Sequence, residues 1–119
     1  MSGATFRTCA VSGRRIEGHA EALIKANAVL SVVALLIGAT AAVLLVLTRW
    51  QAIHLLPALW YYRILGVHGM SMLIFFIIFF EMAVLYFTST VLLNARAVAP
   101  RLGWTAFALM VIGAVTVEY

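Results

Sequence analysis

Charged residues are scarce in this sequence, and their scarcity excludes a water-soluble fold. Only 10% of the 119 residues are charged, while 66% are hydrophobic and the mean hydropathy is +1.11. Soluble domains carry about 25% charged residues, and short ones bury the smallest fraction of their surface. The composition therefore indicates an integral membrane protein whose apolar surface is covered by lipid.

Cysteine is also nearly absent, which excludes a disulfide framework. One cysteine, Cys9, cannot form an internal disulfide, and the segment CAVSG does not form the C-x-x-C-H motif of covalent heme attachment. The eight Lys and Arg residues stand in ones and twos at the ends of apolar runs and form no basic stripe. We therefore expect no nucleic-acid partner, and no nucleotide loop, catalytic triad or zinc constellation is recognisable.

The apolar runs predict an all-α membrane protein. A polar N-terminal segment, residues 1–26, precedes an uncharged run that predicts a helix over about residues 27–48, long enough for a ~30 Å hydrocarbon core. This run exceeds the apolar core of a signal peptide, so we expect a retained helix. A second helix, over about residues 58–95, follows an aromatic linker and has Pro57 at its start.

The third apolar run is shorter. It predicts a helix over residues 104–119, whose ~24 Å falls short of a full crossing. The expected transmembrane region, residues 27–119, therefore has two full transmembrane helices and a partial third, as part of a larger multi-helix bundle. A chain that stops inside a helix is expected to be a fragment or to be covered there by another chain.

The distribution of Lys and Arg predicts the orientation in the membrane. The N-terminal segment has four of these residues and the second loop has two, whereas the first loop has only Arg49 and Arg63. Cytoplasmic loops carry the excess of Lys and Arg. We therefore expect a cytoplasmic N-terminus and a first loop on the outer face.

Two ionisable residues, His68 and Glu81, interrupt the second apolar run. Such groups are costly in hydrocarbon and usually face protein, water or a cofactor. On a helical wheel Met72 and Phe75 lie near the direction of His68, and this face suits a flat, apolar, iron-containing ring. Gly66 and Gly69 would let such a ring or a neighbouring helix approach. The alternative is a histidine bonded to a neighbouring helix or to interfacial water.

Glu81 is predicted to lie ~20 Å deeper than His68 and about 140° away around the helix. It is a candidate for a proton relay, although the relay would need partners from other helices. The alternative is a protonated carboxyl group that is hydrogen-bonded to a neighbouring helix.

The segments YYRILGVHGMSMLIFFIIFFEMAVLYF and NARAVAPRLGW together resemble a known family. They are similar to the second helix and following loop of subunit I of heme–copper terminal oxidases, which are cytochrome c oxidase-like proteins. The resemblance covers residues 27–119, the first two helices and part of the third. It implies that His68 is an axial ligand of the low-spin heme, which relays electrons to the oxygen-reducing heme–copper centre.

Two departures from the family pattern restrict what the chain is expected to do. The second loop has Arg96 and no acid where mitochondrial-like members carry an aspartate, which favours a divergent bacterial or archaeal branch. The chain has three histidines, too few for both hemes and copper. The resemblance thus places the copper and high-spin heme ligands on later helices, and this chain is not catalytic alone.

The resemblance also implies the surroundings of the chain. Its expected partners are the remaining helices of subunit I, other oxidase subunits, the lipid bilayer, and cytochrome c or quinol as electron donor. The expected location is a bacterial or archaeal plasma membrane. A nitric oxide reductase-like subunit, which has iron in place of copper, is an alternative. A cofactor-free accessory or assembly subunit is another.

Overall fold

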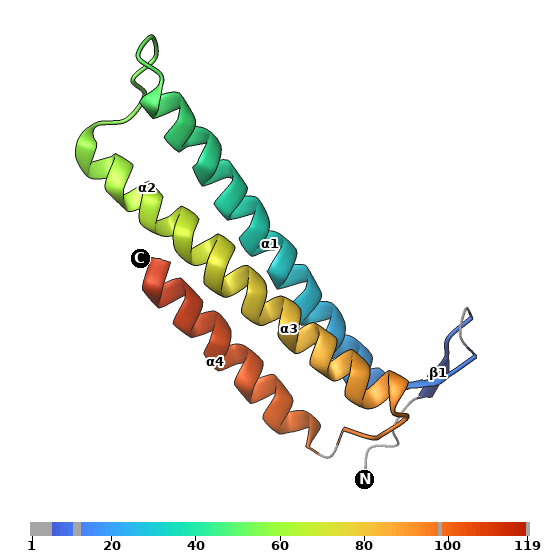
Figure 1. Ribbon diagram of the computed structural model, residues 1–119. Coiled ribbons are helices and arrows are strands. Elements are labelled where there is room, and N and C mark those ends of the chain that lie inside the picture. Colours follow the sequence, from blue (N-terminus) through green and yellow to red (C-terminus); the bar gives the residue numbers. More distant parts are fainter. Residues whose placement is uncertain (1–5, 11–12, 98, 119) are drawn as a thin grey trace.

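The computed structural model describes residues 6–10, 13–97 and 99–118, and most of them are helical. Three long helices lie side by side in an elongated molecule with extents of 60 × 29 × 18 Å (Figure 1). All three are long and apolar enough to span a membrane, which confirms the predicted all-α membrane class. The elements are α1 (Gly18–Arg49), α2 (Ala58–Met70), η1 (Ser71–Phe75), α3 (Phe76–Tyr86), η2 (Phe87–Leu92) and α4 (Pro100–Glu118), of which α2 to η2 form one continuous helix.

Helix α1 begins at Gly18, before the predicted start at residue 27. Its first turns are polar and carry an ion pair between Glu21 and Lys25, with 2.6 Å between Oε1 and Nζ. A Glu followed by a Lys four residues later stabilises a helix, and an acidic residue in the first turn complements the helix dipole. The prediction from the apolar run therefore covered the apolar part of α1 and left out its polar first turns.

The second helix ends at Leu92, before the predicted residue 95. The amide of Leu93 donates to the Thr88 carbonyl, and Asn94 has a φ of 53°. Asn is one of the few residues that adopts this left-handed conformation, which commonly terminates helices. Helix α4 begins at Pro100, where the fixed φ of proline suits a first turn, and its 19 residues give ~28 Å of helix.

The contact between α1 and the second helix is built largely from small side chains. The buried residues of α1 recur every three or four positions, so they form one stripe along the helix. Small residues such as Ala34, Gly38 and Ala41 let the backbones approach closely. Most large apolar side chains point away from this contact and are exposed, as expected where lipid or other helices surround a bundle.

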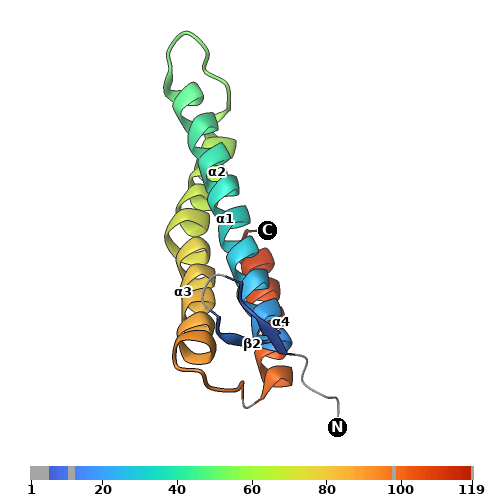
Figure 2. The same cartoon turned by 90° about the vertical axis from the view of Figure 1, so that its right-hand side faces the viewer.

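The polar N-terminal segment contains structure that the sequence did not predict. Strands β1 (Phe6–Thr8) and β2 (Arg15–Glu17) form an antiparallel hairpin in which Arg7 is paired with Ile16. The hairpin lies at the same end of the molecule as the end of η2 and the start of α4 (Figures 1 and 2), and β2 packs against η2. The segment over residues 1–26 therefore folds, in its described part, into a hairpin and the first turns of α1.

Candidate functional site

His68 lies near the end of α2, and its imidazole reaches the backbone of α1. The distance between His68 Nδ1 and the Gly38 carbonyl oxygen is 2.8 Å. A backbone carbonyl can only accept a hydrogen bond, so Nδ1 must carry the hydrogen. In the neutral imidazole the other nitrogen, Nε2, then has a free lone pair and is the atom available to a metal.

Gly38 permits this contact because its missing side chain lets the second helix approach α1 closely. A Cβ at this position would lie 2.5 Å from Met72 Cγ and 2.7 Å from Met72 Sδ, closer than real Cβ contacts. Glycine therefore leaves room for the Met72 side chain against the backbone of α1. The same close approach brings the Gly38 carbonyl within hydrogen-bonding reach of His68.

The surroundings of His68 on its own helix leave space for a further group. A Cβ at Gly66 or at Gly69 would have no heavy atom within 4 Å. The space beside these glycines is therefore not filled by α1 or α4. The hydrogen bond to Gly38 matches the alternative expected for a structural histidine, but it uses one nitrogen only. His68 and Gly38 therefore fit an axial heme ligand that would bind iron through Nε2 while the Gly38 carbonyl orients the ring through Nδ1.

Two residues predicted to pack against heme have contacts with neighbouring helices. Met72 packs on Gly38, and Phe75 lines an apolar cavity of about 400 Å³ together with side chains of α1 and α4. Both residues lie in the π-helical segment η1. A π turn closes i→i+5 hydrogen bonds and so changes the rotation per residue. Contact of Met72 and Phe75 with heme stays a prediction.

Glu81, the proton-relay candidate, is exposed on the surface of α3. Within the part of the chain that the structure describes, its carboxyl group makes no hydrogen bond or ion pair. It therefore points away from the packing between α1, α3 and α4. Any proton partner of Glu81 has to come from another helix or from water.

An intramembrane polar pair, Ser71 and Glu118, was missed by the sequence interpretation. The Ser71 hydroxyl donates to Glu118 Oε1 at 2.7 Å and so joins η1 to the end of α4. Glu118 Oε2 is buried and has no hydrogen-bond partner among the described residues. Both residues line the cavity that contains Phe75. A serine inside an apolar run and an acid at the end of another were the available signals, but their pairing depends on helix packing.

We expect Ser71→Ala to destabilise the packing of α4 against the second helix by about 1 kcal/mol, the scale of hydrogen bonds between membrane helices. The change removes the donor and leaves Glu118 without its hydrogen bond. The free energy of unfolding in mixed micelles measures the effect. Ser89→Ala is the matched control because the Ser89 hydroxyl bonds only carbonyls of its own helix. Equal effects of the two substitutions would show that the interhelical bond contributes nothing.

A metal centre built from several side chains is not formed by the described residues. Among them, no group of three or more His, Cys, Asp or Glu side chains is placed to hold a metal ion. A heme iron needs only axial ligands from protein, because the macrocycle supplies the others. His68 alone would therefore be enough to supply the one axial heme ligand that is expected of this chain.

Comparison with known families gives one match, and it extends over most of the chain. Residues 22–118 match the family described as cytochrome c and quinol oxidase polypeptide I. No curated protein and no solved structure matches the chain. The matched range contains all three long helices apart from the first turn of α1, and it includes His68, Gly38 and Glu81. The chain belongs to the cytochrome c and quinol oxidase polypeptide I family.

Proposed function

We propose that this chain is a segment of subunit I of a respiratory heme–copper oxygen reductase, in which His68 is an axial ligand of the low-spin heme. The observation that carries the proposal is the 2.8 Å hydrogen bond between His68 Nδ1 and the Gly38 carbonyl. A histidine that binds a metal almost always donates its other ring N–H to a carbonyl or carboxylate. The bond fixes the imidazole tautomer and orientation that ligation by Nε2 requires.

The low-spin heme supplies one-electron transfer toward the oxygen-reducing centre. The residues of this chain set the conditions for that transfer. The Gly38 carbonyl makes the His68 imidazole a stronger electron donor, because it accepts a hydrogen bond from Nδ1–H. The apolar helices exclude water around the ligand, and ligand type and burial together determine the reduction potential.

The proposal includes the surroundings of the chain. The second axial ligand, the high-spin heme ligand and the copper ligands belong to other helices of subunit I. Cytochrome c or quinol delivers electrons through the complex. The excess of Lys and Arg at the end that carries the hairpin supports a cytoplasmic N-terminus. The proposed location is a bacterial or archaeal plasma membrane. His68 then lies toward the outer face.

Glu81 is proposed as a proton-relay residue of the assembled complex. Its exposed position on α3 supports a role toward a neighbouring helix, since a carboxyl group facing lipid directly would be costly. A neighbouring helix or a water chain would then supply the proton partner.

The reduced-minus-oxidised visible spectrum of the purified complex containing this chain tests the proposal. A low-spin heme band that copurifies with the chain supports it. An intact assembly without heme would favour the cofactor-free accessory subunit and overturn the proposal. The copper content of the same preparation separates an oxygen reductase from a nitric oxide reductase-like complex, which has iron in place of copper.

A further inference from the structure

The end of the molecule that carries the hairpin is strongly basic. Six of the eight Lys and Arg residues lie in the N-terminal segment or in the loop and first turn between η2 and α4. The other two, Arg49 and Arg63, flank the opposite end. At the basic end the hairpin, the end of η2 and the following loop enclose a cavity of about 260 Å³.

Two guanidinium groups that line this cavity lie against one aromatic ring. Arg15 Cζ lies 5.3 Å and Arg96 Cζ lies 5.4 Å from the centroid of the Phe6 ring. Both distances suit cation–π contacts, which hold a cation in place without neutralising it. Among the described residues neither arginine forms an ion pair with a carboxylate. The two like charges therefore lie in one cavity without a carboxylate at ion-pair distance among the described residues.

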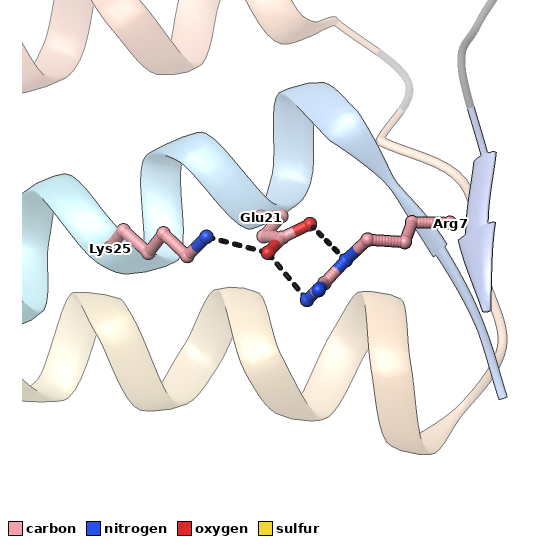
Figure 3. Close-up of polar contacts among 3 residues, drawn as sticks. All are labelled: Arg7, Glu21 and Lys25. Carbon is pink, nitrogen blue, oxygen red and sulfur yellow. Dashed lines mark hydrogen bonds and ion pairs between the residues drawn. The ribbon is translucent and has the colours of Figure 1, made fainter. Parts of the chain in front are cut away.

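Three other basic residues at this end, Arg7, Arg14 and Lys25, already have partners. Glu21 binds both Arg7 and Lys25 (Figure 3). Arg14 Nη1 donates to the carbonyls of Val91 and Leu92, at 3.0 Å and 2.6 Å, and so covers the end of η2.

Among the described residues, Glu17 is the one acid that lines the cavity, and its carboxylate accepts a hydrogen bond from the Ala97 amide at 3.2 Å. Two positive charges against one negative charge leave the cavity with a net positive charge.

We propose that this cavity binds the phosphate group of an anionic phospholipid. The planar guanidinium fork matches the geometry of phosphate oxygens. The cavity lies where apolar helices end, at the depth at which headgroups meet the membrane surface, and basic residues here attract anionic lipid. Beside it Leu92 and Leu93 are exposed, by 48% and 77%, and offer an apolar surface for acyl chains. A free phosphate ion would gain nothing from that surface.

The test is retention of phosphatidylglycerol by the complex containing this chain in nanodiscs of phosphatidylcholine with a minor fraction of phosphatidylglycerol. The test variant is Arg15→Gln with Arg96→Gln. The matched control, Lys25→Gln with Arg101→Gln, removes the same charge at the same end but outside the cavity. We expect about a 30-fold weaker affinity for the test variant, because both guanidinium groups lose their direct contacts with the phosphate oxygens. Salt screening keeps the control within about fivefold of the unchanged complex.

Native mass spectrometry counts the retained phosphatidylglycerol, and the assembled mass shows that each variant is intact. Should the glutamine variant fail to assemble, Arg15→Lys with Arg96→Lys keeps the charge, loses the fork, and is expected to weaken binding by a smaller factor. An equal loss in test variant and control would overturn the proposal in favour of general surface charge. Displacement of the lipid by equimolar inorganic phosphate would overturn it in favour of a free-anion site. Neither result depends on the role of His68.

Discussion

Replacing His68 with alanine is expected to remove the low-spin heme from the complex and to abolish oxygen reduction. Alanine has no group that can bind iron, whereas the proposed ligand atom is His68 Nε2, since Nδ1 donates to the Gly38 carbonyl. Losing an outer partner of a metal ligand costs about 10–100-fold in affinity or activity, and losing the ligand itself is expected to cost more. Heme content per complex and the rate of oxygen consumption measure the two effects.

His54→Ala and His19→Ala are the matched controls for this substitution. Both residues are exposed, His54 in the linker before α2 and His19 in the first turn of α1. We expect both variants to keep the heme content and activity of the unchanged complex. If His68→Ala assembles and retains its low-spin heme, the histidine is structural and the proposed ligand role is wrong.

Replacing Gly38 with alanine is expected to weaken heme retention by about tenfold, the lower end of the range for outer-shell partners. The new Cβ would lie 2.5 Å from Met72 Cγ, so either the Met72 side chain moves or the helices separate. Separation lengthens the bond between the Gly38 carbonyl and His68 Nδ1, which leaves the imidazole less well oriented. Heme content after dilution and the reduction potential of the low-spin heme are the measurements.

Two further variants isolate the cause. Gly113→Ala gains the same helix propensity, but its Cβ meets no heavy atom within 4 Å, so we expect no loss of heme. Met72→Ala combined with Gly38→Ala removes the side chain that the new Cβ would contact, and we expect it to restore most of the heme retention. A double variant as defective as Gly38→Ala alone would show that steric contact with Met72 is not the cause.

The sequence predicted the class of fold because its strongest signal is hydrophobicity. Long uncharged runs need helices in lipid, since every backbone polar group must be satisfied internally. Helix ends were less predictable. Glu21 and Lys25 extend α1 beyond the apolar run through their ion pair, and the left-handed Asn94 follows the end of the second helix. These are local interactions that a count of apolar residues does not register.

The sequence predicted one residue of the candidate site, His68, but not the contacts that this residue makes. His68 stood out because a lone imidazole in an apolar helix needs a partner. Its bond to Gly38 spans 30 positions in the sequence and depends on how α1 packs. The pairing of Ser71 in η1 with Glu118 in α4 likewise depends on helix packing. The hairpin was missed because short polar strands give no hydropathy signal.

The role of His68 as an iron ligand is tested most directly by chemical rescue. The measurement is the reduced-minus-oxidised visible spectrum of the His68→Gly complex, reconstituted with heme, before and after addition of imidazole. We expect the low-spin band to be absent at first and to return when free imidazole occupies the vacated position. A low-spin band of unchanged intensity in His68→Gly without imidazole would contradict the proposed function.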